Sequence, residues 1–351
     1  MQGKAVTVLG PVEPESLGLT LTHEHLLHDL KLSVFKQPVP NRIEHATNIS
    51  LFSLENLGYI RQYPYCYDFN IEFNSVGDAI KEEMDYFKRN GGGTIVDNCS
   101  IGLRANGQAD YLEELSQSTG VKIVAGSGFY VSGSQSQSTL HMSVETLCEK
   151  LRQDLLVGMD GTNIKCGCIG EVGCSWPITD FEKKSLVSTA IVQEETGAPV
   201  IIHPGRDSRC PEEIFRVFQE AGGRVSNTVM SHLDRTLLTK ESLLEFASLG
   251  SYCEFDLFGI EVSLYQLDEL IPMPSDAQRM ESLRCLIQEG YGDKIVVAHD
   301  IHTKHRLMKY GGHGYSHILL NIVPIMKSRG FHPEDVRKIL YTNPASWLTF
   351  H

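Results

Sequence analysis

The sequence predicts an α/β fold in which eight parallel strands and their connecting helices close into a (β/α)8 TIM barrel. From about residue 75 onward, short β-branched apolar segments alternate with longer segments of helical periodicity, which is typical of repeated βαβ units. Several helical segments end in glycine directly before a strand, as at residues 90–93, 196–197 and 289–290. The 351 residues carry no linker-like break, so we expect one domain over 1–351.

Eight strand candidates follow one another in the order that a barrel requires. Each is a short apolar run bounded by polar residues or glycine. Their ranges are 18–22, 94–99, 122–126, 164–169, 199–202, 227–231, 251–255 and 294–298. Helices with spaced apolar positions are expected at 76–89, 144–156, 181–196, 211–220, 240–247, 276–289 and 316–328. A doubly wound open sheet is the alternative, but it usually has a Gly-rich phosphate loop after its first strand, and none occurs here.

The composition argues against several classes of partner. Asp and Glu number 44 against 31 Lys and Arg, a formal net charge of -13, which disfavours binding to nucleic acid or to an anionic membrane surface. No run of about 18 apolar residues occurs, and the N-terminal segment lacks a signal-like apolar core. The nine cysteines, mostly within apolar runs, are expected to be reduced core residues of a cytoplasmic protein. A zinc site at Cys166 and Cys168 is disfavoured because no second cysteine pair follows.

Side chains that can bind metals fall at the carboxyl ends of five strand candidates. They are His23, His25, Glu171, His203, His232 and Asp300. In a barrel these strand ends converge on one face. The two-residue period of a strand turns His23 and His25 inward and Glu24 away. A His-x-His pair alone is as readily two buried histidines, but four further strand ends supply histidine or carboxylate, which favours a metal site.

Four imidazoles and two carboxylates suit a pair of divalent ions, and zinc is the expected metal although manganese, iron or cobalt would accept the same ligands. Glu171 could bridge the two ions. The formal charges of the two ions, the two carboxylates and a bridging hydroxide sum to about +1. This positive charge would attract an acyl or phosphoryl oxygen. The sequence thus predicts a binuclear centre at the C-terminal face of the strands.

The same segments resemble the amidohydrolase superfamily and, more closely, the phosphotriesterase family. The resemblance runs nearly end to end, through residues 21–25, 170–176, 202–206, 230–235, 298–300 and 309–317. It implies that His23, His25 and Asp300 hold the more buried ion. It implies further that His203 and His232 hold the more exposed ion and that Glu171 bridges both.

Two positions depart from the bacterial phosphotriesterases that this chain resembles. Those enzymes carry a carboxylated lysine where this chain has Glu171, and a proton-shuttle histidine where it has Leu257. Paraoxon-like chemistry is therefore not expected, and the site should assemble without bicarbonate. Within its subgroup, the resemblance implies hydrolysis of small N-acyl compounds, N-acetyltaurine foremost and N-acetyl amino acids besides.

In this hypothesis a hydroxide that bridges the metals attacks the amide, the metals polarise the acyl oxygen, and Asp300 carries a proton to the leaving amine. Arg206 is the first candidate for binding the anionic end of the substrate, because its planar fork suits sulfonate or carboxylate. A surface salt bridge is the alternative. Arg235 is a weaker candidate because Asp234 could pair with it. Tyr130 and Lys304 are further pocket candidates, with ordinary packing at the rim as the alternative.

Two other functions stay open at this stage. The same centre could hydrolyse esters, lactones or phosphotriesters, or the barrel could bind a ligand without turnover. The expected partners are a small anionic N-acyl substrate and a second copy of the chain in a homodimer. The four histidines after the last strand, at 302, 305, 313 and 317, are expected to be structural. Residues 31–74 are expected to cover the barrel mouth.

Overall fold

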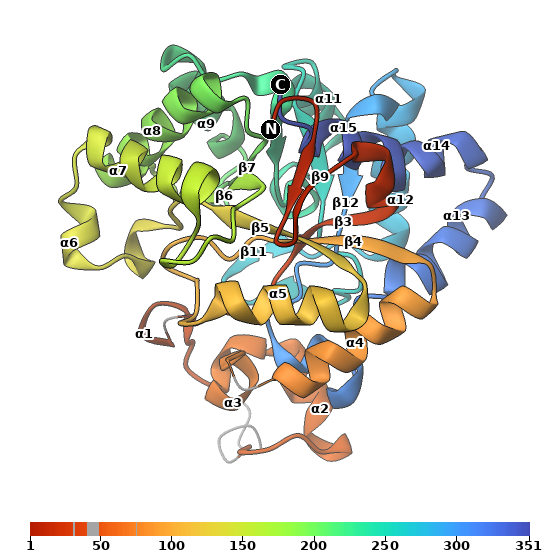
Figure 1. Ribbon diagram of the computed structural model, residues 1–351. Helices are drawn as coiled ribbons and strands as arrows, with labels where there is room; N and C mark the ends of the chain where they lie inside the picture. Colours follow the sequence, from red (N-terminus) through yellow and green to blue (C-terminus); the bar gives the residue numbers. More distant parts are fainter. Residues whose placement is uncertain (31, 41–48, 75) are drawn as a thin grey trace.

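The computed structural model describes residues 1–30, 32–40, 49–74 and 76–351. Eight strands form one parallel sheet whose spatial order is their order in the sequence, and helices surround it (Figure 1). The strands are β3 (Leu19–Glu24), β4 (Gly92–Asp97), β5 (Lys122–Ser127), β6 (Cys168–Gly173), β7 (Val200–His203), β8 (Thr228–Met230), β9 (Tyr252–Phe255) and β12 (Ile295–Val297). The first and last strands meet where the Asp300 N–H donates to the His23 carbonyl at 3.0 Å and the Thr22 hydroxyl donates to the Val297 carbonyl at 3.3 Å. The predicted barrel is confirmed.

Most of the predicted helices are present near their expected positions. The helices beside the strands are α4 (Gly77–Arg89), α5 (Gln108–Thr119), α7 (Val144–Arg152), α8 (Asp180–Thr196), α9 (Cys210–Glu220), α11 (Lys240–Ala247), α12 (Asp276–Gln288) and α13 (Val323–Ser328). Shorter helices are α6 (Gln137–Leu140), α10 (Leu233–Thr236), α14 (Pro333–Arg337) and α15 (Asn343–Leu348). Helix α5 was not predicted. It begins after Gly107 without a side-chain cap, so the usual start signal is missing from the sequence.

The amino end of the barrel is filled with apolar side chains. One inward-facing residue from each of several strands contributes to this cluster, including Val96, Val124, Ile201 and Val296. Trp347 of α15 closes the end and donates its indole N–H to the Val200 carbonyl at 3.1 Å. The chain termini lie together at this end, opposite the mouth (Figure 1). Since this end is plugged, only the carboxyl ends of the strands are left to form a ligand site.

Two segments cover the mouth. The described part of residues 31–74 forms α1 (Leu32–Phe35), α2 (Leu54–Gln62) and α3 (Asp68–Ile71), which lie on the side of the barrel opposite the termini (Figure 1). The prediction that this connection covers the mouth is confirmed for these residues, whereas residues 31 and 41–48 lie outside the described part. The second cover is an unpredicted antiparallel hairpin of β10 (Leu264–Tyr265) and β11 (Asp268–Pro272). Another such hairpin joins β1 (Ala5–Thr7) to β2 (Gly10–Val12).

Strand β6 differs from its prediction by four residues, because the sequence suggested 164–169 and the strand is Cys168–Gly173. Gly167 bonds through its N–H to the Ala125 carbonyl at 2.8 Å, but pairing with β7 begins only at Ile169. Glycine lets β6 approach its neighbours closely, since a Cβ on Gly170 would lie 2.5 Å from the Ile201 carbonyl oxygen. Because the strand is Cys168–Gly173, Glu171 lies inside β6 and not after its end. The pairing of β6 with β7 is irregular at this position.

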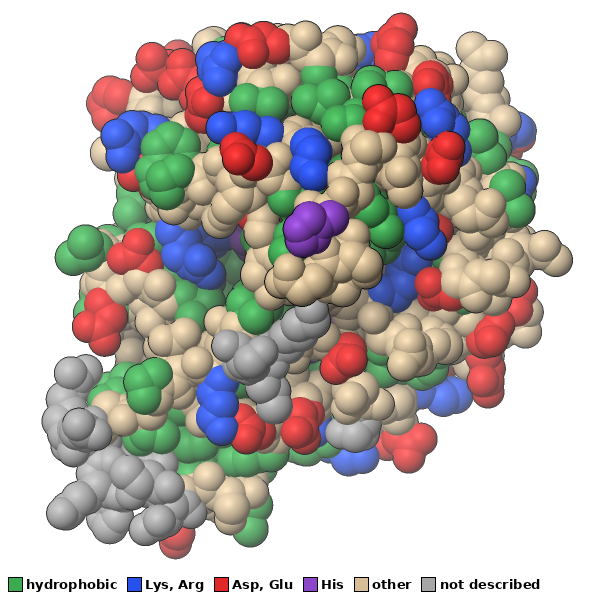
Figure 2. Space-filling model, turned by 90° about the vertical axis from the view of Figure 1, so that its left-hand side faces the viewer, with side chains coloured by type: hydrophobic (Ala, Val, Ile, Leu, Met, Phe, Trp, Pro, Cys, Tyr) green, Lys and Arg blue, Asp and Glu red, His purple; other side chains and the backbone are tan. Residues whose placement is uncertain are grey.

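The described surface is charged (Figure 2), and the cysteines are mostly buried. On the face shown in Figure 2, Lys and Arg side chains are interspersed with Asp and Glu. All nine cysteines are free thiols, and eight of them are buried. None of the helices in the described ranges combines the length and the apolarity needed to cross a membrane.

A buried carboxyl group ties α4 to the loop that follows β12. Glu83 accepts hydrogen bonds from the N–H groups of Met308 at 2.5 Å and Tyr315 at 3.3 Å. Burial raises the pKa of Glu83 to about 7, because the charged form is poorly solvated there. The unfolded chain loses this proton at lower pH than the folded protein does. Glu83 therefore lowers the free energy of unfolding as the pH rises from about 4.5 to about 7.

We expect the Glu83→Gln variant to gain stability relative to the parent protein as the pH increases. The difference in melting temperature, variant minus parent, should rise by on the order of 5 °C between pH 5 and pH 8. Differential scanning fluorimetry across this range measures it. Glu82→Gln, a change at the exposed neighbour, is the control and should show a flat difference. A flat difference for Glu83→Gln as well would contradict the raised pKa.

Candidate metal centre

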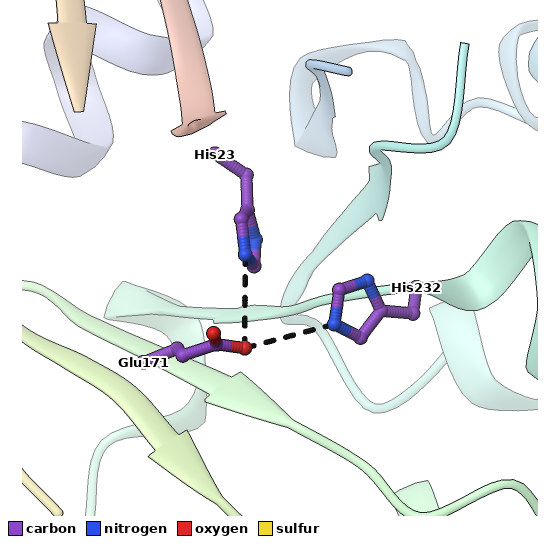
Figure 3. Close-up of side chains that lie close together, drawn as sticks. All are labelled: His23, Glu171 and His232. Carbon is purple, nitrogen blue, oxygen red and sulfur yellow. Dashed lines mark ion pairs between the residues drawn. The ribbon is translucent and has the colours of Figure 1, made fainter. Parts of the chain in front are cut away.

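The structure brings the six predicted metal-binding side chains to one place at the barrel mouth. In Figure 3, Glu171 Oε2 lies 3.6 Å from His23 Nε2 and 3.7 Å from His232 Nε2. The same oxygen lies 2.8 Å from His203 Nδ1. On the other side, His25 Nε2 lies 3.6 Å from Glu171 Oε1 and 3.1 Å from Asp300 Oδ1. Six donor groups from five strands thus surround one small volume.

The donor atoms divide into two overlapping groups of metal-binding size. The ligand atoms of His23, His25 and Asp300 lie within 4.8 Å of one another, and so do those of His23, Glu171 and His232. The two oxygens of Glu171 reach different histidines, Oε1 lying near His25 and Oε2 lying near His23, His203 and His232. This is the placement that a bridging carboxylate requires.

The chemistry of the buried atoms fits a cation. His23 Nε2 is fully buried and has no hydrogen-bond partner among the described residues. A buried ring nitrogen without a partner is costly, and a metal ion at this position would satisfy it. Burial also lowers the pKa of His203 to about 3, so its ring is neutral, which is the form that binds a metal.

A second layer of side chains holds the far nitrogens of the histidines. His23 Nδ1 donates to Glu254 Oε2 at 3.0 Å, and His232 Nδ1 donates to Asp256 Oδ1 at 2.8 Å. His25 Nδ1 lies 3.2 Å from Cys99 Sγ. Because Nδ1 of each of these three rings faces this layer, Nε2 is the ring nitrogen that faces the centre.

The pKa values of the two carboxylates in this layer are shifted in opposite directions. Burial raises the pKa of Glu254 to about 7. Burial would raise the pKa of Asp256 too, but the charge of His232 and bonds from His23 and His232 hold it well below its usual range. Sequence reasoning missed both residues. Asp256 directly follows the candidate strand 251–255, so the rule that found the other carboxylates would have found it as well.

The backbone at two of the predicted ligands is in the left-handed region. His232 has φ 57° and Asp300 has φ 54°, which few residues other than glycine adopt. Both N–H groups are anchored, that of His232 by Asp256 Oδ2 at 3.0 Å and that of Asp300 by the His23 carbonyl. These anchors hold the strained turns that aim the two side chains at the centre.

Glu24 fixes the loop that carries Asp300. Its side chain points away from the centre, as the strand period predicts, and its Oε1 accepts from the N–H and Nδ1 of His299 at 2.9 and 2.7 Å. Its Oε2 accepts from the Ile301 N–H at 3.0 Å. The residues on both sides of Asp300 are thereby tied to β3.

The centre opens into a narrow cavity of about 50 Å³. Tyr130, Arg206 and Arg235 of the predicted substrate-binding residues line it, together with Leu257. The Tyr130 hydroxyl lies 3.4 Å from His203 Nδ1. Tyr65 and Tyr265, which the sequence did not single out, also line it. They belong to the two segments over the mouth, and their approach to the centre depends on how those segments fold back.

Lys304 is not placed in this cavity. It lies in the turn η8 (Lys304–Arg306), outside the residues that line the space around the centre. The His305 N–H in this turn donates to Asn70 Oδ1 of α3 at 2.8 Å. Burial lowers the pKa of Lys304, and the negative charge of Glu72 opposes this effect. The packing of α3 on this turn explains why Lys304 lies outside the cavity although it is close to Asp300 in the sequence.

Two guanidinium groups lie at the side of the cavity, that of the half-buried Arg206 and that of the buried Arg235. Arg206 Nη2 donates to the Tyr265 hydroxyl at 3.4 Å, and the guanidinium groups of Arg206 and Arg235 lie 5.3 and 5.8 Å from the centre of the Tyr265 ring. Asp234 does not pair with Arg235, because its Oδ2 accepts from Arg279 Nε at 2.8 Å. Among the ion pairs of the described residues, none joins a carboxylate to Arg206 or Arg235, and the neighbouring Asp207 and Asp234 pair with Arg209 and Arg279. The cavity therefore has uncompensated positive charge on this side.

Comparison with known proteins identifies the family. The profile described as the Phosphotriesterase family matches residues 3–348. The chain belongs to the phosphotriesterase family. Members of the phosphotriesterase family are metal-dependent hydrolases, so this chain is a hydrolase of that class.

Two relatives within the phosphotriesterase family match the whole chain. The N-acetyltaurine hydrolase of Danio rerio is 51% identical over 350 residues, which cover 100% of this chain and 99% of the relative. A phosphotriesterase-related protein of Nematostella vectensis is 49% identical over 352 residues, which cover 99% of each chain. Among solved structures, a resiniferatoxin-binding protein from Rhodobacter sphaeroides superposes with a TM-score of 0.92 at 29% identity, covering 99% of this chain and 95% of that one.

Proposed function

We propose that this chain is a binuclear metal amidohydrolase of small anionic N-acyl compounds, with N-acetyltaurine as the first candidate substrate and N-acetyl amino acids as further ones. The observation that carries the proposal is the pairing of a two-metal donor set with two arginines, Arg206 half-buried and Arg235 buried, that lack carboxylate partners in the described residues. The name of the 51% identical relative, N-acetyltaurine hydrolase, supports it. N-acetyltaurine has an amide for the donor set and a sulfonate for the arginines.

The proposed metals are two ions of zinc. His23, His25 and Asp300 would hold one ion, His203 and His232 would hold the other, and Glu171 would bridge them. When bound, such ions polarise an acyl carbonyl and activate water at neutral pH. Glu171 supplies its carboxylate without modification, so assembly should not require carbon dioxide. We further propose action in the cytoplasm, where nine free thiols would remain reduced; the homodimer stays a prediction.

Asp300 is the residue best placed to move the proton. Its Oδ1 lies between His25 Nε2 at 3.1 Å and His302 Nδ1 at 3.2 Å, and its backbone is anchored at both neighbours. In the proposed reaction an oxygen of Asp300 accepts the proton of the attacking water and delivers it to the amide nitrogen. An amine leaves poorly unless it is protonated, so this delivery matters more for amides than for activated esters.

Arg206 and Arg235 would hold the sulfonate or carboxylate of the substrate. Arg206 Nε is buried and has no hydrogen-bond partner among the described residues. Arg235 donates from Nη2 to the Pro204 carbonyl at 3.1 Å and from Nη1 to the Thr236 hydroxyl. An anion here would give both guanidinium groups charge-assisted bonds. Tyr130 would contact the substrate from the side of His203. The cavity of about 50 Å³ favours a compact substrate.

Ligand binding without turnover is the second candidate function. The likeness to a resiniferatoxin-binding protein favours it, because that name describes binding. Ester, lactone or phosphotriester hydrolysis is the remaining alternative. Turnover assays on the metal-loaded protein distinguish all three.

We expect purified protein to contain two divalent ions per chain and to hydrolyse N-acetyltaurine while leaving aryl phosphotriesters almost untouched. Metal content is measured by inductively coupled plasma mass spectrometry, and taurine release by chromatography. Chelation should abolish turnover, and zinc should restore it equally with and without bicarbonate. Dependence on bicarbonate, or phosphotriester turnover equal to amide turnover, would contradict the proposal. Binding without turnover of any substrate would leave the second candidate.

We expect Asp300→Asn to lose nearly all amide turnover, by on the order of 10³-fold, while an activated aryl ester loses far less. The physical reason is that the aryl oxide leaves without a proton. The assay compares the two substrates on variant protein whose metal content has been measured and found intact. Equal losses on both substrates would rule out proton delivery by Asp300.

We expect Arg206→Gln to lower kcat/KM for N-acetyltaurine by roughly 10- to 100-fold, mainly through KM. A neutral N-acetyl amide of similar length should be nearly unaffected, because it has no anion to bind. Arg209→Gln is the matched control on the same loop, since Arg209 is exposed and paired with Asp207 at 2.8 Å. If the two substrates lose activity equally in Arg206→Gln, Arg206 does not bind the anion.

A further inference from the structure

A second and larger cavity lies beside the one at the metal centre. Its volume is about 530 Å³, and its lining combines apolar side chains such as Ile260, Met280, Ile322 and Ile325 with charged ones such as Arg61 and Arg329. The two cavities have four lining residues in common, and they are Tyr65, Ile260, Tyr265 and His302. The smaller cavity is thus separated from a space roughly ten times larger by a few side chains.

Tyr65 and His302 form the part of this wall next to the centre. The Tyr65 hydroxyl donates to His302 Nε2 at 2.7 Å, and the two rings are stacked with centroids 5.9 Å apart and planes inclined by 18°. His302 is held in turn, because its Nδ1 donates to the Asp300 carbonyl at 2.8 Å. The two rings therefore close the wall as one hydrogen-bonded unit.

The backbone of Tyr65 is fixed on both sides of its ring. The Tyr65 N–H donates to Gln266 Oε1 of the second covering segment at 2.9 Å, and its carbonyl accepts from the Gln37 N–H at 2.7 Å. Only 6% of Tyr65 is exposed. Both segments over the mouth thus hold this residue against the wall, and its ring position does not depend on one contact.

The position of the anion site indicates which part of a substrate meets this wall. The wall reaches both parts of the substrate site. At one end the Tyr265 hydroxyl accepts from Arg206 Nη2 at 3.4 Å, and at the other end His302 Nδ1 donates to the Asp300 carbonyl at 2.8 Å. With the anion at the arginines and the carbonyl at the metal centre, an acyl chain beyond the carbonyl would extend toward the His302 end, where the Tyr65 ring is stacked.

We propose that Tyr65 sets the acyl-length limit of this hydrolase, and that the second cavity takes a longer apolar acyl chain once the Tyr65 ring is removed. This inference rests on the proposed amide hydrolysis. The wall would impose a preference for acetyl over longer acyl groups, because each added methylene would meet an aromatic ring. Behind the ring, the apolar lining would bury those methylenes favourably.

The experiment compares the parent protein, Tyr65→Ala and Tyr65→Phe on taurine amides with acyl chains of two to eight carbons. We expect kcat/KM of the parent to fall steeply with chain length. In Tyr65→Ala it should instead rise with chain length by up to about fourfold per methylene, the order expected for burying a CH₂ group. Tyr65→Phe is the matched control, because its ring still fills the wall, and it should keep the parent profile.

Filling the second cavity tests where the chain goes. Ile325 lines this cavity and is partly exposed, so Ile325→Trp can be introduced into the Tyr65→Ala protein without disturbing the core. The double variant should lose most of the gain on long acyl chains. A gain that persists, or a gain on longer amine parts in place of longer acyl parts, would overturn the proposal.

A binding measurement separates this inference from the proposed function. Calorimetric titration of N-octanoyltaurine into metal-loaded protein needs no turnover, and we expect at least tenfold tighter binding to Tyr65→Ala than to the parent. Equal binding to both proteins would overturn the acyl-length limit even if N-acetyltaurine is hydrolysed. Absence of N-acetyltaurine turnover in the parent, with tighter binding to the variant retained, would overturn only the proposed reaction.

Discussion

The closure of the barrel between its first and last strands is the constraint on which the site depends. His23 belongs to β3, His25 directly follows it and Asp300 follows β12, so more than 270 residues separate groups whose atoms lie 3.1 to 3.9 Å apart. Glu24 holds the two strand ends together by accepting three hydrogen bonds from His299 and Ile301. The three hydrogen bonds compensate the loss of solvation of this buried carboxylate. Their favourable free energy opposes the entropic cost of closing so long a loop.

The distribution of uncompensated polar groups explains why ligands should bind here. Around the centre, the far sides of the His23, His232 and His25 rings contact Glu254, Asp256 and Cys99, while His23 Nε2 faces inward without a hydrogen-bond partner in the described structure. Across the cavity, Arg206 and Arg235 present positive charge to the same space. Burial of such groups is unfavourable in the free protein, so metals at one end and an anion at the other would both be stabilising.

The two segments over the mouth add the features that distinguish one substrate from another. The segment after β3 contributes Tyr65, and the β10–β11 hairpin contributes Tyr265. Gln266 of the hairpin connection bonds to the Tyr65 N–H, so the two covers support each other. The strands fix the chemistry of the centre, while these covers determine the size and charge of the space beside it. Selectivity can therefore change through the covers without altering the strand ends.

The sequence by itself determined the eight-strand order, the inward direction of His23 and His25, and the residue types at the strand ends, because strand periodicity and turn chemistry are local. Only the tertiary structure decided the register of β6, the partner of Asp234, and the positions of Lys304, Tyr65 and Tyr265. Each of these depends on a contact between distant segments, such as Asp234 with Arg279 or α3 with the turn at Lys304. A local pattern carries no information on which distant segment will pack against it, and packing at the mouth is what forms the cavity.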